Sequence, residues 1–132
     1  MSNVVIDTNI ASYILKGDTR AAMYREHLRG TVALSFMTVA ELYYWADIAL
    51  WGIRKRAELQ TFLQEYAILR SNEVTCRLWA RIRAKCAQQG RPISVQDAWI
   101  AACTIQANAA LVTHNRKDFE AVPDLRIISE NG

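Results

Sequence analysis

The sequence contains no apolar run of the roughly 18 residues that a membrane-spanning helix requires. Its first residues, Met1-Ser2-Asn3, carry no basic side chain, and Asp7 interrupts the apolar stretch that follows them. We therefore expect neither a membrane-spanning segment nor a signal peptide. Repeats, low-complexity segments and linkers are also missing, so we expect a single domain over residues 1–132.

Cysteine and net charge are both scarce. Cys76, Cys86 and Cys103 are odd in number and lack C-x-x-C spacing, so we expect buried, reduced thiols in a cytoplasmic protein. The 16 basic and 13 acidic residues leave a net charge of +3, which by itself says little about partners. Hydrophobic residues, in contrast, make up 52% of the chain, and a chain of this length buries a sizeable core.

Short apolar stretches alternate with helical patterns along the chain. Strands are expected at residues 4–6, 31–35, 67–69, 110–113 and 126–128. Helices are expected at residues 10–16, 20–29, 38–51, 54–66, 73–89 and 95–109, with Gly17 and Gly30 ending the first two. This alternation predicts an α/β fold with a mostly parallel sheet flanked by helices.

Four carboxylates lie at junctions between these elements, namely Asp7, Glu41, Asp97 and Asp118. Parallel strands bring their carboxyl ends to one edge of a sheet, where ligands bind in open α/β folds. We therefore expect the four acids to converge there, where their mutual repulsion would raise their pKa values. A divalent cation relieves that repulsion, and oxygen ligands suit Mg²⁺ or Mn²⁺ better than zinc.

Each acid also has a purely structural interpretation. Asp7 is a good helix N-cap, and Thr38 through Glu41 match a capping box. Ser94 through Asp97 match a looser form of the same pattern, and Asp118 suits the start of a short turn. Capping and function are compatible, because a cap fixes the direction in which a neighbouring carboxylate points.

Four segments, taken together, resemble a known family. In order and spacing, "VVIDTNI", "SFMTVAEL", "GRPISVQDAWIAA" and "LVTHNRKDF" resemble the motifs of PIN-domain ribonucleases, and the small size is similar to that of VapC toxins. The resemblance runs from Val4 to about Ile128 and implies a PIN-like α/β/α sandwich. It further implies an endoribonuclease that depends on Mg²⁺ or Mn²⁺, with an RNA substrate such as tRNA and an antitoxin partner. The matching acids are Asp7, Glu41, Asp97 and Asp118, and the matching supporting residues are Thr8, Asn9, Thr113 and Asn115.

Roles within this group stay partly open. We expect Asp7 to be the central metal ligand, with Asp97 and Asp118 as direct or water-mediated ligands, while Glu41 either ligates or acts as the base. His114 lies between two supporting residues, but neighbouring side chains on a strand face opposite ways, so we do not place it in the site.

Basic residues indicate a surface for the RNA backbone. Without the four acids, 16 basic residues face only 9 acidic ones. Arg77, Arg81 and Lys85 recur on one helix face, and Arg116 lies near Asp118, so we expect these four cations to contact RNA. The alternative is that these four cations lie on solvent-exposed faces and contact no RNA.

The helix expected from Thr38 is apolar on two sides. Val39, Leu42, Tyr43 and Ala46 form one stripe, and Tyr44, Ile48 and Trp51 form another. Such a helix is either deeply buried or shared with another chain, so it predicts a homodimer face or a groove for an antitoxin helix.

Four alternative functions compete with this one. A receiver-type phosphoacceptor domain needs an Asp after the third strand, and "AILRSN" has none; a dehalogenase-like phosphatase needs D-x-D, and "DTN" lacks the second acid. A non-catalytic RNA-binding module of the same fold, or a PIN nuclease of RNA processing without an antitoxin, stays open.

Overall fold

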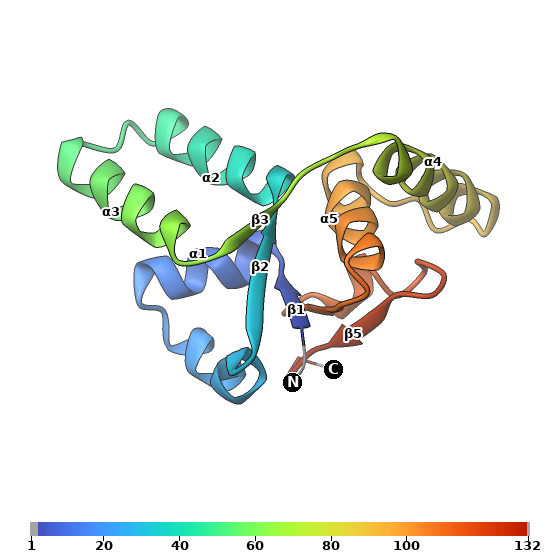
Figure 1. The fold of residues 1–132 in the computed structure, drawn as a ribbon, viewed down its shortest axis with the longest axis horizontal. Helices are drawn as coiled ribbons and strands as arrows, with labels where there is room; N and C mark the ends of the chain where they lie inside the picture. The colour runs from blue at the N-terminus through green and yellow to red at the C-terminus, as the bar shows by residue number, and fades with distance from the viewer. Residues whose placement is uncertain (1–2, 132) are drawn as a thin grey trace.

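A five-stranded parallel sheet forms the centre of the structure, a computed structural model that describes residues 3–131 (Figure 1). Its strand order is β3-β2-β1-β4-β5, and every neighbouring pair is parallel. The strands are β1 (Asn3–Ile6), β2 (Thr31–Ser35), β3 (Ala67–Leu69), β4 (Ala110–Val112) and β5 (Arg126–Ile128). The parallel α/β fold expected from the sequence is confirmed.

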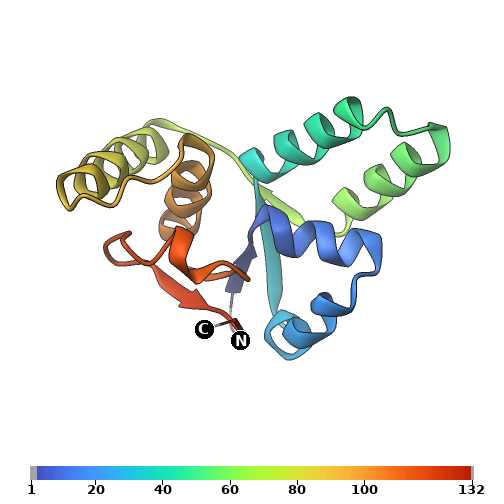
Figure 2. The same ribbon diagram turned by 180° about the vertical axis from the view of Figure 1, so that it is seen from behind.

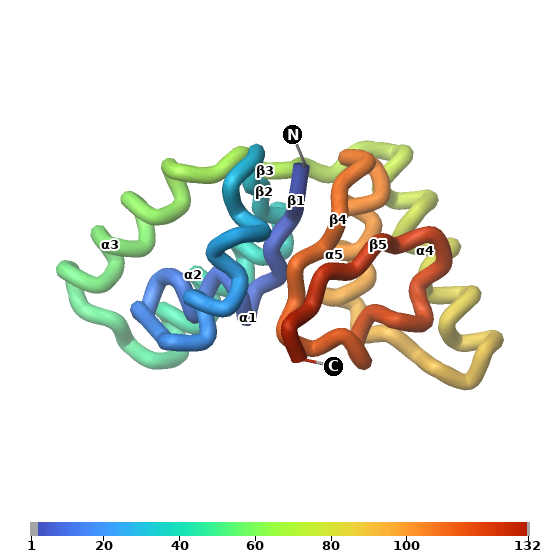
Figure 3. Tube along the Cα trace, turned by 90° about the horizontal axis from the view of Figure 1, so that it is seen from below, coloured from blue at the N-terminus to red at the C-terminus, as the bar shows by residue number. Residues whose placement is uncertain are grey.

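Helices cover both faces of this sheet. The helices are α1 (Thr8–Lys16), α2 (Phe36–Ile48), α3 (Ile53–Gln64), α4 (Glu73–Gln88) and α5 (Val95–Gln106), with 3-10 helices η1 (Thr19–Leu28) and η2 (Arg116–Asp118). Figure 1 shows α2 and α3 on one side of the sheet and α4 and α5 on the other. From behind, α1 and η1 lie on the side of α2 and α3 (Figure 2). The view in Figure 3, along the sheet, separates the same two helical layers.

Alternating strand residues feed two separate cores. Val5 and Leu111 pack among residues of α4 and α5, whereas Val4, Ile6 and Val112 pack among residues of α1, α2 and α3. Successive strand side chains point to opposite faces, so apolar residues at every position are buried on one side or the other. This explains why the central strands are continuous apolar runs rather than alternating ones.

Two helix predictions are wrong. Residues 20–29 were expected to be an α-helix but form the 3-10 helix η1, in which Tyr24 is the one buried residue. A helix in a protein is stabilised mainly by burying an apolar face, and this segment has too little to bury. Helix α2 begins at Phe36 with Ser35 as its N-cap, not at Thr38, because Ser35 directly follows β2 and accepts a hydrogen bond from the Met37 N–H.

The cysteine prediction is correct in part. All three thiols are free, and Cys86 and Cys103 are buried, but Cys76 is exposed because α4 turns it toward solvent. Within residues 3–131, no helix is both long and apolar enough to cross a membrane. The expectation of no signal peptide rests partly on Met1 and Ser2, which lie outside the described residues.

Candidate active site at the carboxyl edge of the sheet

The order in which strands are added to the sheet reverses at β1. The chain passes from β1 to β2 and β3 on one side, and β4 and β5 lie on the other, so β1 and β4 are neighbours. Crevices at the carboxyl end of such a switch point are where open α/β sheets bind ligands. Asp7 follows β1 at this point, and its backbone N–H donates to the Val112 carbonyl at 3.1 Å.

All four predicted acids line one small pocket at this edge. Asp7 precedes α1, Glu41 lies in the second turn of α2, Asp97 lies in the first turn of α5, and Asp118 ends η2. The pocket measures about 80 Å³, and the other residues that line it are Thr8, Asn9, Trp45 and Phe119. Parallel strands and the helices that follow them bring these distant residues together, as the sequence pattern predicts.

Asp7 is both a helix cap and a buried carboxylate. Its Oδ1 accepts the Ile10 N–H at 2.9 Å, which caps α1, and its Oδ2 accepts the Thr113 hydroxyl at 2.6 Å. Burial raises the pKa of Asp7 to about 6, and repulsion from Asp118 and Glu41 adds to the rise, while the two hydrogen bonds oppose it. The side chain is only 4% exposed, and each carboxylate oxygen retains a lone pair for a further ligand.

Thr113 is itself held in place by the chain beyond it. The Asn115 N–H donates to the Thr113 Oγ1 at 3.0 Å, which leaves the hydroxyl hydrogen for Asp7. The Asn115 side chain makes no capping bond to η2, so its contribution here comes through the backbone. His114 lies within hydrogen-bond distance of the Tyr24 hydroxyl, at 2.5 Å, and packs edge-on against that ring; it does not line the acidic pocket.

Glu41 is positioned by two threonines. The Thr8 hydroxyl donates to Glu41 Oε1 at 2.7 Å, and the Thr8 and Thr38 hydroxyl oxygens lie 3.1 Å apart. Thr38 is fully buried, so it supports Glu41 through Thr8 rather than capping α2. The capping-box interpretation of residues 38–41 is therefore wrong. Thr38 and Glu41 instead contact Thr8, and so connect α2 to α1.

Asp97 is fixed by the start of α5. Ser94 is the N-cap, and its side chain accepts the Asp97 N–H at 3.1 Å, as the sequence pattern predicts. Burial raises the pKa of Asp97 to about 6, and the nearby Asp118, Asp7 and Glu41 raise it further. The pKa values of Asp7 and Asp97 are thus both raised, as is common for carboxyl groups at functional sites.

The donor set of this pocket fits a hard divalent cation. Its acids and hydroxyls offer only oxygen, and 80 Å³ exceeds the roughly 30 Å³ that one water molecule occupies in the liquid. Across residues 3–131, no three acid, imidazole or thiol side chains gather closely enough to hold an ion by themselves. A cation here would thus take few direct carboxylate ligands and keep several waters, which is how Mg²⁺ is usually bound.

The cations predicted to contact RNA lie outside this pocket. Arg77, Arg81 and Lys85 are exposed on α4, and Arg77 pairs with Glu73 on the same helix. Arg116 is half-buried at the start of η2. None of these four lines the acidic pocket or the pocket beside it.

A neighbouring pocket of about 240 Å³ shares Asp97 and Asp118 and contains two other cations, Arg91 and Lys117. Lys117 follows Arg116 directly in the sequence, and nothing in the sequence shows which way the short turn of η2 directs each side chain. Arg91 was missed although it lies in "GRPIS", the loop that leads directly to the helix of Asp97.

Comparison with known proteins finds a matching family and relatives that align over most of the chain. The family described as "PIN domain" matches residues 4–125. The chain is 32% identical over 127 residues to "Ribonuclease VapC2" of Haemophilus influenzae, which covers 96% of each chain. It is 30% identical over 127 residues to "tRNA(fMet)-specific endonuclease VapC" of Shigella flexneri, again with 96% of each chain covered.

Solved structures show the same similarity. The DNA-bound VapBC structure from Salmonella typhimurium matches with a TM-score of 0.87 at 27% identity, over 98% of each chain. VapBC2 from Rickettsia felis, bound to a promoter DNA fragment, matches with a TM-score of 0.86 at 26% identity, over 96% of this chain and 98% of that one.

Proposed function

Because the chain belongs to the PIN-domain family, and within it to the VapC proteins, we propose that it is a metal-dependent endoribonuclease and the toxin of a toxin–antitoxin pair. The observation that carries this proposal is the convergence of Asp7, Glu41, Asp97 and Asp118 on one pocket at the switch point of the sheet. A divalent cation bound among these four acids would offset their mutual repulsion and stabilise the folded state.

The proposed cofactor is Mg²⁺ or Mn²⁺, with Asp7 as its central ligand and Asp97 and Asp118 bound to it directly or through water molecules. When bound, such a cation lowers the pKa of water and neutralises charge on the phosphate during phosphodiester hydrolysis. Asp7 contributes a carboxylate whose direction is fixed by Ile10 and Thr113. The backbone of Asp97 is held by the cap of α5, and Asp118 on η2 lines the same pocket.

Glu41 is proposed to accept a proton from the attacking water. Its Oε1 already accepts the Thr8 hydroxyl, so Oε2 is the atom available for that proton. Thr8 and Thr38 hold the Glu41 side chain in one orientation, which general-base catalysis requires. Thr8, Asn9, Thr113 and Asn115 are thus assigned to supporting roles around the four acids.

The proposed substrate is a structured RNA such as tRNA. The relatives from Haemophilus influenzae and Shigella flexneri are named as a ribonuclease and as a tRNA(fMet)-specific endonuclease, which supports RNA over DNA and tRNA as the first target to test. The free thiols suit the cytoplasm, where such RNA is found.

An antitoxin and a second copy of the chain are the proposed partners. On α2, the side chains of Tyr44 and Ile48 are 60% and 62% exposed, so this helix is not the well-covered core helix that was the alternative. Trp51 is half-buried under the Lys55 ammonium and contributes less to this face than expected. Exposed apolar side chains on one helix face are typical of an interface.

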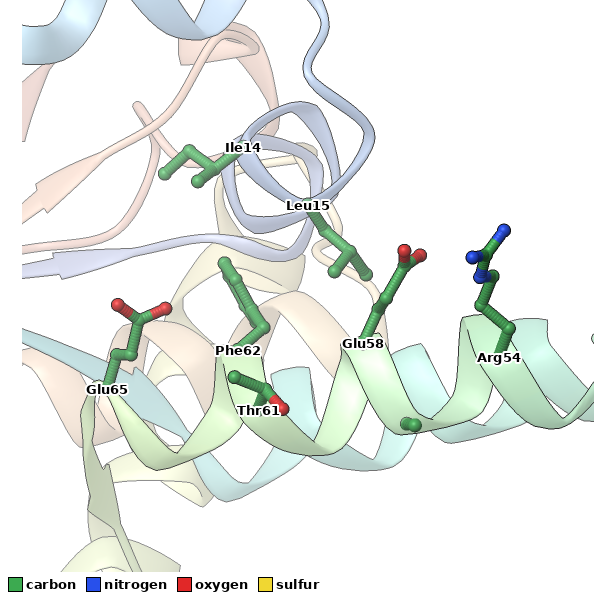
Figure 4. Close-up of a pocket in the computed structure, with 8 residues that line it drawn as sticks. Ile14, Leu15, Arg54, Glu58, Thr61, Phe62 and Glu65 are labelled. Atoms are coloured by element: carbon green, nitrogen blue, oxygen red, sulfur yellow. The ribbon is translucent and has the colours of Figure 1, made fainter.

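A second candidate surface for a partner lies between α1 and α3. Figure 4 shows this groove, in which Ile14 and Leu15 of α1 face Phe62 of α3 and charged side chains form the rim. Its volume is about 600 Å³, enough for several side chains of a docked peptide. The similar structures from Salmonella typhimurium and Rickettsia felis are VapBC complexes, which supports a protein partner for these surfaces.

Sequencing of RNA 5′ ends after brief expression tests the proposed function. New ends at defined positions, absent from cells that express the Asp7→Asn variant, are the expected result. RNA that is bound but not cut by the purified protein with Mg²⁺ or Mn²⁺ would instead identify a non-catalytic RNA-binding module.

A further inference from the structure

A second pocket adjoins the acidic one and has a different electrostatic character. It measures about 240 Å³ and shares Asp97 and Asp118 with the acidic pocket as a common wall. Its remaining side is formed by the loop before α5 and by η2, which contribute Arg91, Ser94 and Lys117. One wall is thus negative and adjoins the proposed cation site, while the other carries two positive charges.

Both cations are placed to contact a ligand in this pocket. Lys117 is exposed and directly precedes Asp118 on η2, and both residues line this pocket. Arg91 is held by Glu120, with 2.6 Å between Arg91 Nη2 and Glu120 Oε1. A guanidinium has five N–H donors, so this ion pair orients Arg91 and leaves donors for an anion.

The charge pattern indicates an anion that extends from the acidic pocket. Asp97 and Asp118 would repel a free anion from this pocket. In a chain of phosphates, however, one phosphate at the cation site holds the next phosphate in the adjoining pocket. RNA carries such a chain, with one negative charge on each nucleotide. The start of α5 adds a weak positive potential on the same side, because Ser94 is its N-cap.

We propose that this second pocket binds the phosphodiester adjacent to the one that is cut, with Lys117 and Arg91 as its cationic contacts. The proposal rests on the proposed ribonuclease function and gives it a direction, since only one of the two flanking phosphates lies in this pocket. Lys117 and Arg91 thereby set which linkage of a bound strand reaches Asp7.

The test uses a short RNA whose cut position has been mapped, in versions with a neutral methylphosphonate at either linkage beside the cut. Full-length protein with Mg²⁺ is compared with Lys117→Ala and Arg91→Ala, and with Arg25→Ala as a control that removes an exposed arginine of η1 outside both pockets. Initial rates give KM and kcat for each pair of protein and RNA.

Lys117→Ala is expected to raise KM about tenfold with little change in kcat, as for loss of one cationic contact worth about 1.4 kcal/mol. One neutral linkage, and not the other, should cause at least as large a loss in the parent. The same linkage should cause a smaller loss in Lys117→Ala, where Arg91 is the one remaining cationic contact. The salt dependence of kcat/KM should become shallower by about 0.7 in log–log slope, the value for one lost phosphate contact on a single strand. The Lys117→Arg variant should recover most of the affinity that Lys117→Ala loses. Inorganic phosphate should not inhibit cleavage at concentrations at which an uncut competitor RNA does.

Equal behaviour of Lys117→Ala, Arg91→Ala and Arg25→Ala on all RNAs would overturn the proposal while the ribonuclease stands. A parent that does not cut RNA would overturn the proposed function instead. In that case, fluorescence anisotropy with the same RNAs measures binding affinity for each pair of protein and RNA. The proposal for the second pocket is rejected if the neutral linkage lowers the affinity of Lys117→Ala as much as it lowers that of the parent.

Discussion

Thr113 donates its hydroxyl hydrogen to Asp7 Oδ2 over 2.6 Å and thereby joins the ends of β4 and β1. The two residues are 106 positions apart in the sequence, and both side chains are buried. This bond links the architecture to the proposed chemistry, because it orients a carboxylate that would otherwise be free to rotate at the centre of the pocket.

Replacing Thr113 by Val keeps the shape of the side chain and removes its hydroxyl, which is the donor to Asp7 and the acceptor of the Asn115 N–H. The ionised Asp7 then loses one of its two partners, so the free energy of unfolding at neutral pH should fall by about 2 kcal/mol. The loss should shrink in mildly acidic buffer, where Asp7 is protonated. Urea unfolding of parent and variant in both buffers measures this effect.

Thr104→Val is the matched control for that experiment. Thr104 is equally buried, but its hydroxyl donates to the Ile100 carbonyl within α5. Its stability change should therefore be the same in both buffers. A Thr113→Val effect that is equally independent of pH would contradict the proposed link to the charge of Asp7.

The raised pKa values predict how the metal-free protein responds to pH. Asp7 and Asp97 have pKa values of about 6 in the folded state against 3.8 for the ordinary carboxyl, so between these values the folded state binds more protons than the unfolded state. Stability in EDTA should therefore fall as pH rises from about 4 to about 7, and level off above that. Melting temperatures across this range measure it; a rise through this window would contradict the assignment.

The exposed face of α2 predicts a variant that loses a partner but not its fold. Ile48→Glu should keep a native circular dichroism spectrum, because Ile48 is 62% exposed, and light scattering should show loss of the dimer or of antitoxin binding. Leu42→Ala on the buried side of α2 should instead cost about 2–5 kcal/mol of stability. An Ile48→Glu protein that unfolds would mean that this face is core.

The sequence specified the sheet and most helices because their signals are local. Val4, Val5 and Ile6 are apolar on both faces of a strand, and Gly17 adopts the left-handed conformation that ends α1. The acids were predicted to meet because parallel strands end at one edge. Residues 19–28 form a 3-10 helix and not an α-helix, and how much of this segment is buried depends on what packs against it. A local sequence pattern carries no information on such contacts.

The finer structure of the site depends on contacts between distant elements. Thr38 has the sequence of a cap, but Thr8 of α1 is within hydrogen-bond distance of it, and Ser35 caps α2 instead. Lys117 lines a pocket and Arg116 does not, because the direction of each side chain is set by the tight turn of η2. Neither result follows from spacing alone.

The charge of Asp7 is the central element of the proposed function, and Asp7→Asn removes it with little change in shape. Asn caps helices about as well as Asp, so α1 should remain intact. In EDTA at neutral pH the variant should be at least as stable as the parent, because repulsion with Asp118 and Glu41 is relieved.

The most direct measurement combines RNA cleavage with melting curves for parent and Asp7→Asn, each with Mg²⁺ and with EDTA. We predict that the parent cuts RNA and melts at a higher temperature with Mg²⁺, while the variant does not cut and shows a much smaller shift. An Asp7→Asn protein that cuts RNA at the rate of the parent, with the same Mg²⁺-induced shift, would reduce Asp7 to a helix cap and contradict the proposed metal-dependent nuclease.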